Sequence, residues 1–160
     1  MTDFVPDHFE PPRECVGEGF RLVPLDVEHN ERDYEAWTSS MEHIAQTPGF
    51  ANWGWPKPMT LAENHGDLAR HAADFRNRVG FTYTVLDGDD VIGCVYIYPG
   101  GGPGEASVRS WVRESRAELD RPLYERVTQW LAEAWPFTQV VYAPREAPRE
   151  PARPRGADPR

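Results

Sequence analysis

The chain has 160 residues, the length of one domain of about 100–200 residues. Its 26 acidic side chains outnumber 17 basic ones, and the net charge of −9 argues against a nucleic-acid binder or a protein of anionic membrane surfaces. No apolar run reaches the ~18 residues of a membrane span, and the polar start does not resemble a signal peptide. We therefore expect a cytoplasmic protein whose two cysteines, Cys15 and Cys94, are reduced.

Both ends of the chain lack the periodicity of packed elements. Residues 1–18 are rich in proline and acidic residues, and they predict an irregular leader. Residues 143–160 contain no large aliphatic or aromatic side chain and predict a disordered tail, because such a segment has almost nothing to bury. The folded domain is therefore expected over residues 19–142.

The first elements of this domain are a strand and a helix. Alternating residues predict a short strand over 20–25, and Pro24 indicates either an edge strand or a position near the end of the strand. Apolar residues at spacings of three and four predict a helix over 30–46. Its expected buried positions are Tyr34, Trp37, Met41 and Ile44. A loop over 50–59 follows, rich in aromatic residues and prolines.

A second helix is expected from Thr60 to Val79. Thr60 and Glu63 match a capping box, in which each side chain hydrogen-bonds the backbone of the other residue. Gly80 would end the helix, since glycine tolerates the backbone conformation found after helix ends. The expected buried stripe is Leu61, His65, Leu68, Ala72, Phe75 and Val79.

The second half of the chain predicts three strands, a helix and a last strand. The strands are expected over 81–86, 91–98 and 106–113, with a hairpin turn at 87–90 and a flexible tip at 99–104. Asp120 would cap a helix over 120–134, and a final strand follows at 138–142. The resulting order, β-α-α-β-β-β-α-β, predicts an α/β (α+β) fold with a central, mostly antiparallel sheet flanked by helices.

This order of elements resembles the GNAT superfamily of acyl-CoA-dependent N-acyltransferases over residues 18–142. The strings Phe-Thr-Tyr-Thr-Val-Leu at 81–86 and Val-Ile-Gly-Cys-Val-Tyr at 91–96 resemble its central hairpin, and 110–113 resembles the strand that leads to its cofactor loop. The resemblance implies transfer of an acyl group from acetyl-CoA to an amine of a small molecule. It also implies that Trp111, Val112 and Arg113 contact the cofactor.

The segment that would bind the cofactor phosphates departs from the family pattern. The family places glycines between strand and helix because bare backbone amides must approach the pyrophosphate, but residues 113–122 contain none. An ionised Asp120 at the helix start would also repel phosphate. Arg113, Arg116 and Arg121 could replace the glycine loop, or they could pair with neighbouring acids. The helix and strands with which the family continues are not found in 143–160. The alternative is therefore a non-catalytic GNAT-like domain that binds a ligand or a protein and has lost acetyl-CoA binding.

Several side chains are candidates for the chemistry of such a site. Glu105, His65 or His43 could take a proton from the amine, although each also suits a solvated or structural position. Arg109 lies on one face of its strand with Trp111, and an arginine there needs a partner or an open pocket. With Trp53, Trp55, Tyr96 and Tyr98 it would form an aromatic-walled cavity suited to a small acidic or aromatic ligand. The same aromatic residues could instead be core.

Two further expectations concern metals and partners. The five histidines show no spacing typical of a metal site, so no metal is expected. The last strand lacks the neighbours that the family places beside it, and an unpaired edge favours pairing with another chain. We therefore expect a homodimer or a protein partner at this edge.

Overall fold

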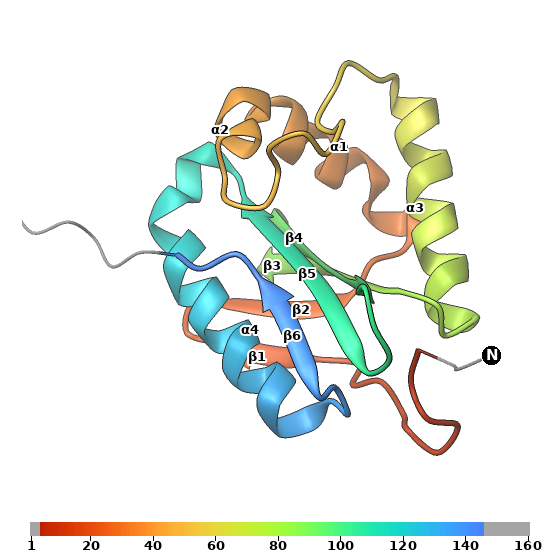
Figure 1. Ribbon diagram of the computed structural model, residues 1–160. Helices are drawn as coiled ribbons and strands as arrows, with labels where there is room; N and C mark the ends of the chain where they lie inside the picture. The colour runs from red at the N-terminus through yellow and green to blue at the C-terminus, as the bar shows by residue number, and fades with distance from the viewer. Residues whose placement is uncertain (1–3, 146–160) are drawn as a thin grey trace, which may run out of the picture.

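A computed structural model describes residues 4–145 of the chain. Its centre is one six-stranded sheet in the order β1-β2-β3-β4-β5-β6 (Figure 1). Neighbouring strands are antiparallel except for β5 and β6, which are parallel. The sequence prediction of a mostly antiparallel sheet flanked by helices is confirmed.

The elements follow the predicted order, with β1 in addition. The strands are β1 (Cys15–Gly17), β2 (Phe20–Pro24), β3 (Phe81–Asp87), β4 (Asp90–Pro99), β5 (Glu105–Val112) and β6 (Gln139–Tyr142). The helices are α1 (Asn30–Thr38), α2 (Met41–Ala45), α3 (Leu61–Arg76) and α4 (Asp120–Ala134), with short 3-10 turns η1 (Val27–His29) and η2 (Glu114–Leu119). None of the helices in the described part of the chain is long and apolar enough to cross a membrane.

Strand β4 is buried on both faces of the sheet. Val95 and Ile97 belong to the core under α4, whereas Cys94 and Tyr96 belong to the core under α1, α2 and α3. Successive side chains of a strand point to opposite faces, so this single strand contributes to both layers. Figure 1 shows α4 across one face and the other helices on the opposite side.

Helix α3 begins with the predicted capping box. The Thr60 hydroxyl accepts a hydrogen bond from the Glu63 amide (3.0 Å), and the Glu63 carboxylate accepts one from the Thr60 amide (2.8 Å). The predicted buried stripe is wrong at Leu61, His65 and Val79, which are exposed, while Asn64 is only 3% exposed. The helix also ends three residues before Val79, because the chain turns at Arg78 with a φ of 64°.

The helix predicted over 30–46 is broken into α1 and α2. Ser39 and Ser40 separate the two, and Ser40 has a non-helical φ of −134°. Its hydroxyl accepts a hydrogen bond from the Glu114 amide at 2.8 Å. Residues 40 and 114 are far apart in sequence, so the local sequence pattern does not reveal this contact. The hydrogen bond joins the break between α1 and α2 to the turn η2 before α4.

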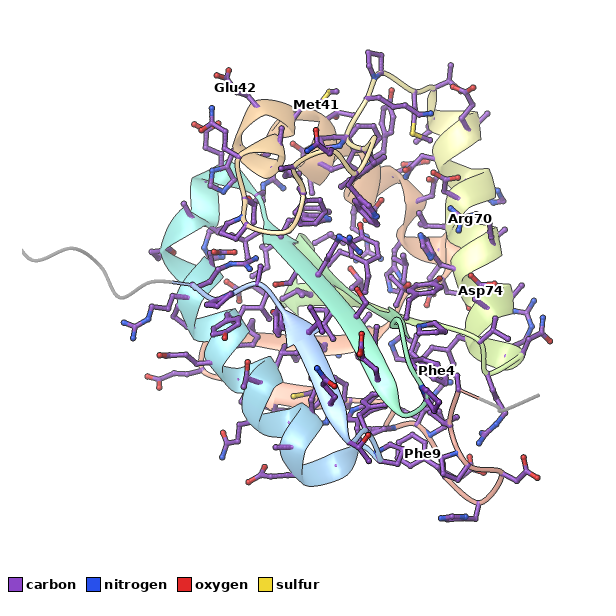
Figure 2. The ribbon with its side chains drawn as sticks, in the orientation of Figure 1. Phe4, Phe9, Met41, Glu42, Arg70 and Asp74 are labelled. Atoms are coloured by element: carbon purple, nitrogen blue, oxygen red, sulfur yellow. The ribbon has the colours of Figure 1, made fainter. Side chains whose placement is uncertain are left out.

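The sequence predicts an irregular leader over residues 1–18, but part of this segment is a strand and part packs on the core. Residues 15–17 form β1, and the side chain of Val5 is buried. Phe4 stacks between Phe81 and Phe137, with ring centroids 5.8 and 5.1 Å away. Figure 2 shows Phe4 and Phe9 beside one end of the sheet. These aromatic contacts add the segment to the core under α4.

The tail predicted over 143–160 lies outside the described residues from 146 onward. Its first part does not match the prediction, because the side chain of Arg145 is buried. Strand β6 forms one edge of the sheet, and Val140 and Val141 are exposed there. The homodimer expected at this edge stays a prediction.

Gly93 in β4 offers a test of the packing between β4 and β5, and Gly66 in α3 serves as its control. A Cβ on Gly93 would lie 2.4 Å from the Trp111 carbonyl oxygen, and backbone atoms cannot move aside cheaply. We expect Gly93→Ala to lower the free energy of unfolding by about 2 kcal/mol or more in urea titrations. Gly66→Ala, in α3 with no atom near the new Cβ, should raise it by about 0.5–1 kcal/mol. Equal stability of the two variants would contradict this packing.

Candidate functional site

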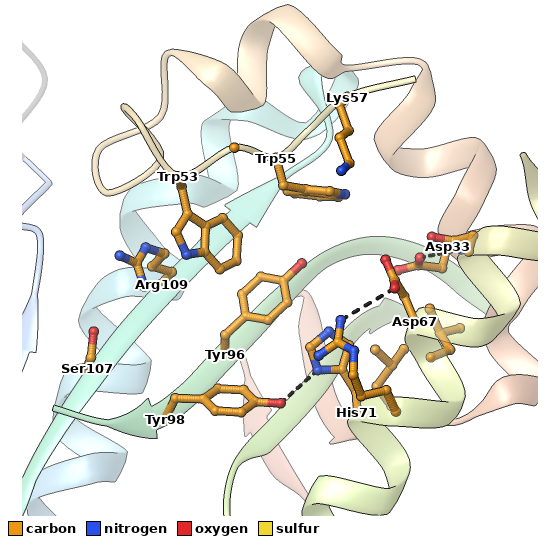
Figure 3. Close-up of a pocket in the computed structure, with 15 residues that line it drawn as sticks. Asp33, Trp53, Trp55, Lys57, Asp67, His71, Tyr96, Tyr98, Ser107 and Arg109 are labelled. Carbon is orange, nitrogen blue, oxygen red and sulfur yellow. Dashed lines mark hydrogen bonds and ion pairs between the residues drawn. The ribbon is translucent and has the colours of Figure 1, made fainter. Parts of the chain in front are cut away.

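A cavity of about 490 Å³ lies between the 46–60 loop, α3 and strands β4 and β5 (Figure 3). The structure brings together in its wall all the side chains predicted to contact a substrate. These are Trp53 and Trp55 from the loop, Tyr96 and Tyr98 from β4, and Arg109 from β5.

The aromatic side of the cavity is a network of rings that support one another. Trp53 meets the edge of Tyr96 at a centroid distance of 5.4 Å, and Trp55 lies 6.1 Å from Trp111 beneath it. The Arg109 guanidinium lies over the Trp53 ring at 4.7 Å, while its Nε donates to the Gly49 carbonyl (2.8 Å). Arg109 therefore anchors the loop to β5, and the aromatic side chains are both wall and core.

The opposite end of the cavity is polar and contains a buried carboxyl group. Asp33 is 4% exposed, and its Oδ2 accepts a hydrogen bond from Asn64 at 3.1 Å. Burial raises the pKa of Asp33 to about 6, the Asn64 hydrogen bond opposes this rise, and the charge of Asp67 adds to it. Asn64 in turn accepts a hydrogen bond from the Trp37 indole at 3.0 Å. The amide thus fixes both the carboxyl and the ring beneath the cavity.

His71 also lines this polar end, and its tautomer follows from its neighbours. The Tyr98 hydroxyl donates its one proton to Asp74 at 2.8 Å. His71 Nδ1 lies 2.8 Å from the same hydroxyl oxygen and 3.1 Å from the Thr82 hydroxyl. Because Tyr98 has no second proton to give, we assign the hydrogen to Nδ1, which donates it to Tyr98.

The other nitrogen of His71 is therefore an unprotonated acceptor. Within residues 4–145, Nε2 has no hydrogen-bond partner. Burial lowers the pKa of His71 to about 4, so the ring is neutral at neutral pH. Asp67 lies nearby, paired with Arg70 at 3.4 Å (Figure 3). The polar end of the cavity thus combines acceptors, at His71 and Asp67, with the donors of Arg70 and Lys57, which also line the cavity.

The residues predicted to bind the cofactor lie apart from this cavity or beneath it. Trp111 and Val112 are fully buried, and the Trp111 indole donates to the Tyr96 hydroxyl at 2.9 Å. Each predicted arginine is paired with acids. The ion pairs are Arg113 with Glu35 (2.7 Å), Arg116 with Asp87 (2.8 Å) and Glu118 (3.3 Å), and Arg121 with Glu125 (3.2 Å).

The start of α4 does not fit acetyl-CoA as it stands. Segment 114–119 forms the turn η2, and Leu119 rather than the predicted Asp120 is the N-cap. The Asp120 carboxylate instead accepts a hydrogen bond from Arg145 Nε at 2.7 Å. A phosphate approaching this helix end would meet the Asp120 carboxylate and arginines already paired with acids.

The three candidates for the catalytic base are not brought to the cavity. Glu105, at the start of β5, accepts a hydrogen bond from the Gly101 amide at 2.8 Å in the hairpin tip. His65 is exposed on α3, and His43 lies on α2. Polar residues that do line the cavity, among them Asp33, Asp67 and His71, were missed. In residues 4–145 no cluster of three metal-ligating side chains occurs.

Comparison with known proteins identifies the fold. No protein-family model and no curated protein sequence matches the chain. Among solved structures, an acetyltransferase from Salmonella typhimurium that modifies the N-terminal serine of a 50S ribosomal subunit protein is 10% identical. Its TM-score is 0.65, over 81% of this chain and 73% of that one.

Two other similar structures were solved with cofactor bound. The microcin self-immunity acetyltransferase MccE, in complex with acetyl-CoA and AMP, has a TM-score of 0.61 at 10% identity, over 78% of this chain and 69% of its own. Mycobacterium smegmatis RimJ, in complex with CoA-disulfide, has a TM-score of 0.55 at 16% identity, over 84% and 66%. The chain therefore has the GNAT acetyltransferase fold, which confirms the resemblance at the level of the fold.

The buried Asp33 predicts a pH dependence of stability. Its folded pKa of about 6 exceeds the ordinary 3.8, so the folded state holds this proton more tightly than the unfolded state does. Its contribution is therefore fully present below the unfolded pKa and is lost as pH rises through about 6. Relative to Asp33→Asn, the wild type should lose on the order of 3 kcal/mol between pH 4 and 7 in urea titrations.

The control for this experiment is Glu42→Gln, on the exposed face of α2. It should track the wild type at every pH. A wild-type stability that stays parallel to that of Asp33→Asn across this range would show that the Asp33 carboxyl is not buried as described.

Proposed function

We propose that the chain is a GNAT-type N-acyltransferase-like protein that binds a small amine with a planar group in the aromatic cavity, as the acceptor of the acyl group. The observation that carries this proposal is the juxtaposition of aromatic side chains at one end of the cavity with hydrogen-bond acceptors at the other. Acetyl-CoA is the acyl donor that the fold suggests, since the similar MccE structure contains it.

The size and lining of the cavity favour a small molecule. A volume of about 490 Å³ is within the range of roughly 300–1,000 Å³ typical of small-molecule sites. Indole and phenol rings offer flat surfaces on which a planar group stacks. A ligand of this kind would lie against Trp53 and Tyr96, whose rings meet edge to face.

The acceptors of the cavity favour an amine over an acid, while the donors Lys57 and Arg70 also line it and Arg70 is paired with Asp67. Nε2 of His71 and the carboxylate of Asp67 both accept hydrogen bonds, so an N–H group satisfies them and a carboxylate does not. The acidic ligand that Arg109 suggested in the sequence is less favoured. The Arg109 guanidinium is already in contact with the Trp53 ring and donates to the Gly49 carbonyl.

A second candidate function is ligand binding without acyl transfer. The observation that favours it is the ion pair between Asp120 and Arg145 at the start of α4, where the resemblance would place cofactor phosphates. Calorimetric titration of wild-type protein with CoA separates the two. Binding at micromolar concentration supports the transferase, whereas none at millimolar concentration supports the ligand-binding protein.

The cavity itself is tested with a small set of probes. We expect 2-phenylethylamine and tyramine to bind more tightly in calorimetry than phenylacetate, which lacks the amine, or butylamine, which lacks the ring. The reason is that only the first two match both ends of the cavity. Equal binding of all four probes, or tightest binding of phenylacetate, would contradict the proposal.

Trp53→Ala is the variant that links this binding to the cavity. Trp53 is 37% exposed, so its removal affects the wall more than the core, and it should weaken amine binding by about tenfold or more. Val79→Ala removes an exposed apolar side chain outside the cavity and serves as the control. The same loss of affinity in both variants would show that the amine binds elsewhere.

A further inference from the structure

Asp33 is the most deeply buried charged side chain in the wall of the aromatic cavity. It lies on α1 with 4% of its surface exposed. Its Oδ2 accepts one hydrogen bond, from Asn64, and its Oδ1 accepts none from residues 4–145. Because an ionised carboxylate accepts up to about four hydrogen bonds, most of the capacity of this group is unused.

The neighbouring amide of Asn64 has no further hydrogen to give to Asp33. One hydrogen of its side chain goes to Asp33 at 3.1 Å, and the other goes to Asn30 Oδ1 at 2.8 Å. The amide oxygen accepts a hydrogen bond from the Trp37 indole at 3.0 Å. This network holds the Asp33 carboxyl in place without using Oδ1, which stays available to a ligand in the cavity.

The charge of Asp33 is also unbalanced. Asp67 is paired with Arg70 at 3.4 Å, whereas Asp33 forms no ion pair within residues 4–145. The charged group that acts on Asp33 is Asp67 itself, a second carboxylate at the same end of the cavity (Figure 3). A buried carboxylate is unfavourable unless it is paired, so a cation at this end of the cavity would be stabilised.

The other titratable groups around Asp33 do not supply this cation. Burial lowers the pKa of His71 to about 4, so its ring is neutral. Burial also raises the pKa values of Cys94 and Tyr96, which keeps both side chains protonated and uncharged. Lys57 lines the cavity from the loop, but its side chain is exposed and forms no ion pair with Asp33.

We infer that the amine binds in this cavity as its ammonium cation, with one N–H group donating to Asp33 Oδ1, so that the site selects cationic ligands over neutral ones of the same shape. This inference rests on the proposed function, because it concerns the acceptor of the same reaction. The rings of Trp55 and Tyr96 in the same wall add to the selectivity, since aromatic faces attract cations. Recognition as a cation concerns binding alone, because the nitrogen must release one proton before it attacks an acyl group.

The test compares tyramine with tyrosol, in which a hydroxyl group replaces the ammonium group on the same ring and chain. In calorimetry at pH 7 we expect tyramine to bind about tenfold or more tightly than tyrosol, since a hydrogen bond between two charged groups is the stronger one. Equal affinity of wild type for the two probes at pH 7 would overturn the inference.

Lowering the pH to 5 should remove most of this preference. Burial raises the pKa of Asp33 to about 6, so at pH 5 most of the free protein carries a proton on this carboxyl, which the cation must displace. Tyramine keeps its own charge at both pH values. Its affinity should therefore fall by about tenfold between pH 7 and 5, whereas that of tyrosol should not change. A tyramine affinity that is the same at both pH values would overturn the inference.

Asp33→Asn removes the charge and keeps the shape of the side chain. In this variant tyramine should bind no more tightly than tyrosol, and its affinity should not depend on pH. The matched control, Asp90→Asn, removes the same charge from the exposed hairpin outside the cavity and should behave as wild type. Circular dichroism and thermal unfolding establish that both variants are folded, and the pH series on wild type needs no variant.

The same probes separate this inference from the proposed function. Absence of tyramine binding to wild type would contradict both the acceptor site and the inference. Binding of tyramine without preference over tyrosol would contradict the inference alone. A preference for tyramine that Asp33→Asn abolishes and Asp90→Asn retains is the result that the inference predicts.

Discussion

Burial of β4 on both of its faces is the constraint on which the rest of the structure depends. Val95 and Ile97 pack under α4, so Tyr96 and Tyr98 between and beyond them point to the opposite side. There the tryptophans of the 46–60 loop cover Tyr96, whereas Tyr98 meets His71 of α3. Arg109 holds this loop to β5 through the Trp53 ring and the Gly49 carbonyl.

The two sides of the molecule differ in which polar side chains already have hydrogen-bond or ion-pair partners. On the side of the aromatic cavity, His71 Nε2 has no partner among residues 4–145, while Asp67 is paired with Arg70. On the side of α4, the arginines are paired with acids and Arg145 fills the gap between β5 and β6. The fold is that of acetyltransferases, and a cavity lies on each side, of about 490 Å³ beside the aromatic residues and of about 480 Å³ beside the paired Asp120 and Arg145.

Local periodicity and capping motifs were sufficient to predict several strands and the start of one helix from the sequence. Alternation located β3, β4 and β5, and the Thr60 and Glu63 pair located the start of α3. The gathering of aromatic residues around Arg109 was also predicted, because strand alternation places Tyr96 and Tyr98 on one face of β4. The contacts of Asn64, His71 and Arg145 were missed, since each joins segments that are far apart in sequence.

The most direct test of the account observes the indole N–H resonances of the six tryptophans by NMR. Adding tyramine should shift the signals of Trp53 and Trp55, which line the cavity. The signals of Trp130 and Trp135, in the core under α4, should stay in place. Shifts confined to the latter pair, or no shift at saturating tyramine, would contradict the claim that the aromatic cavity is the binding site.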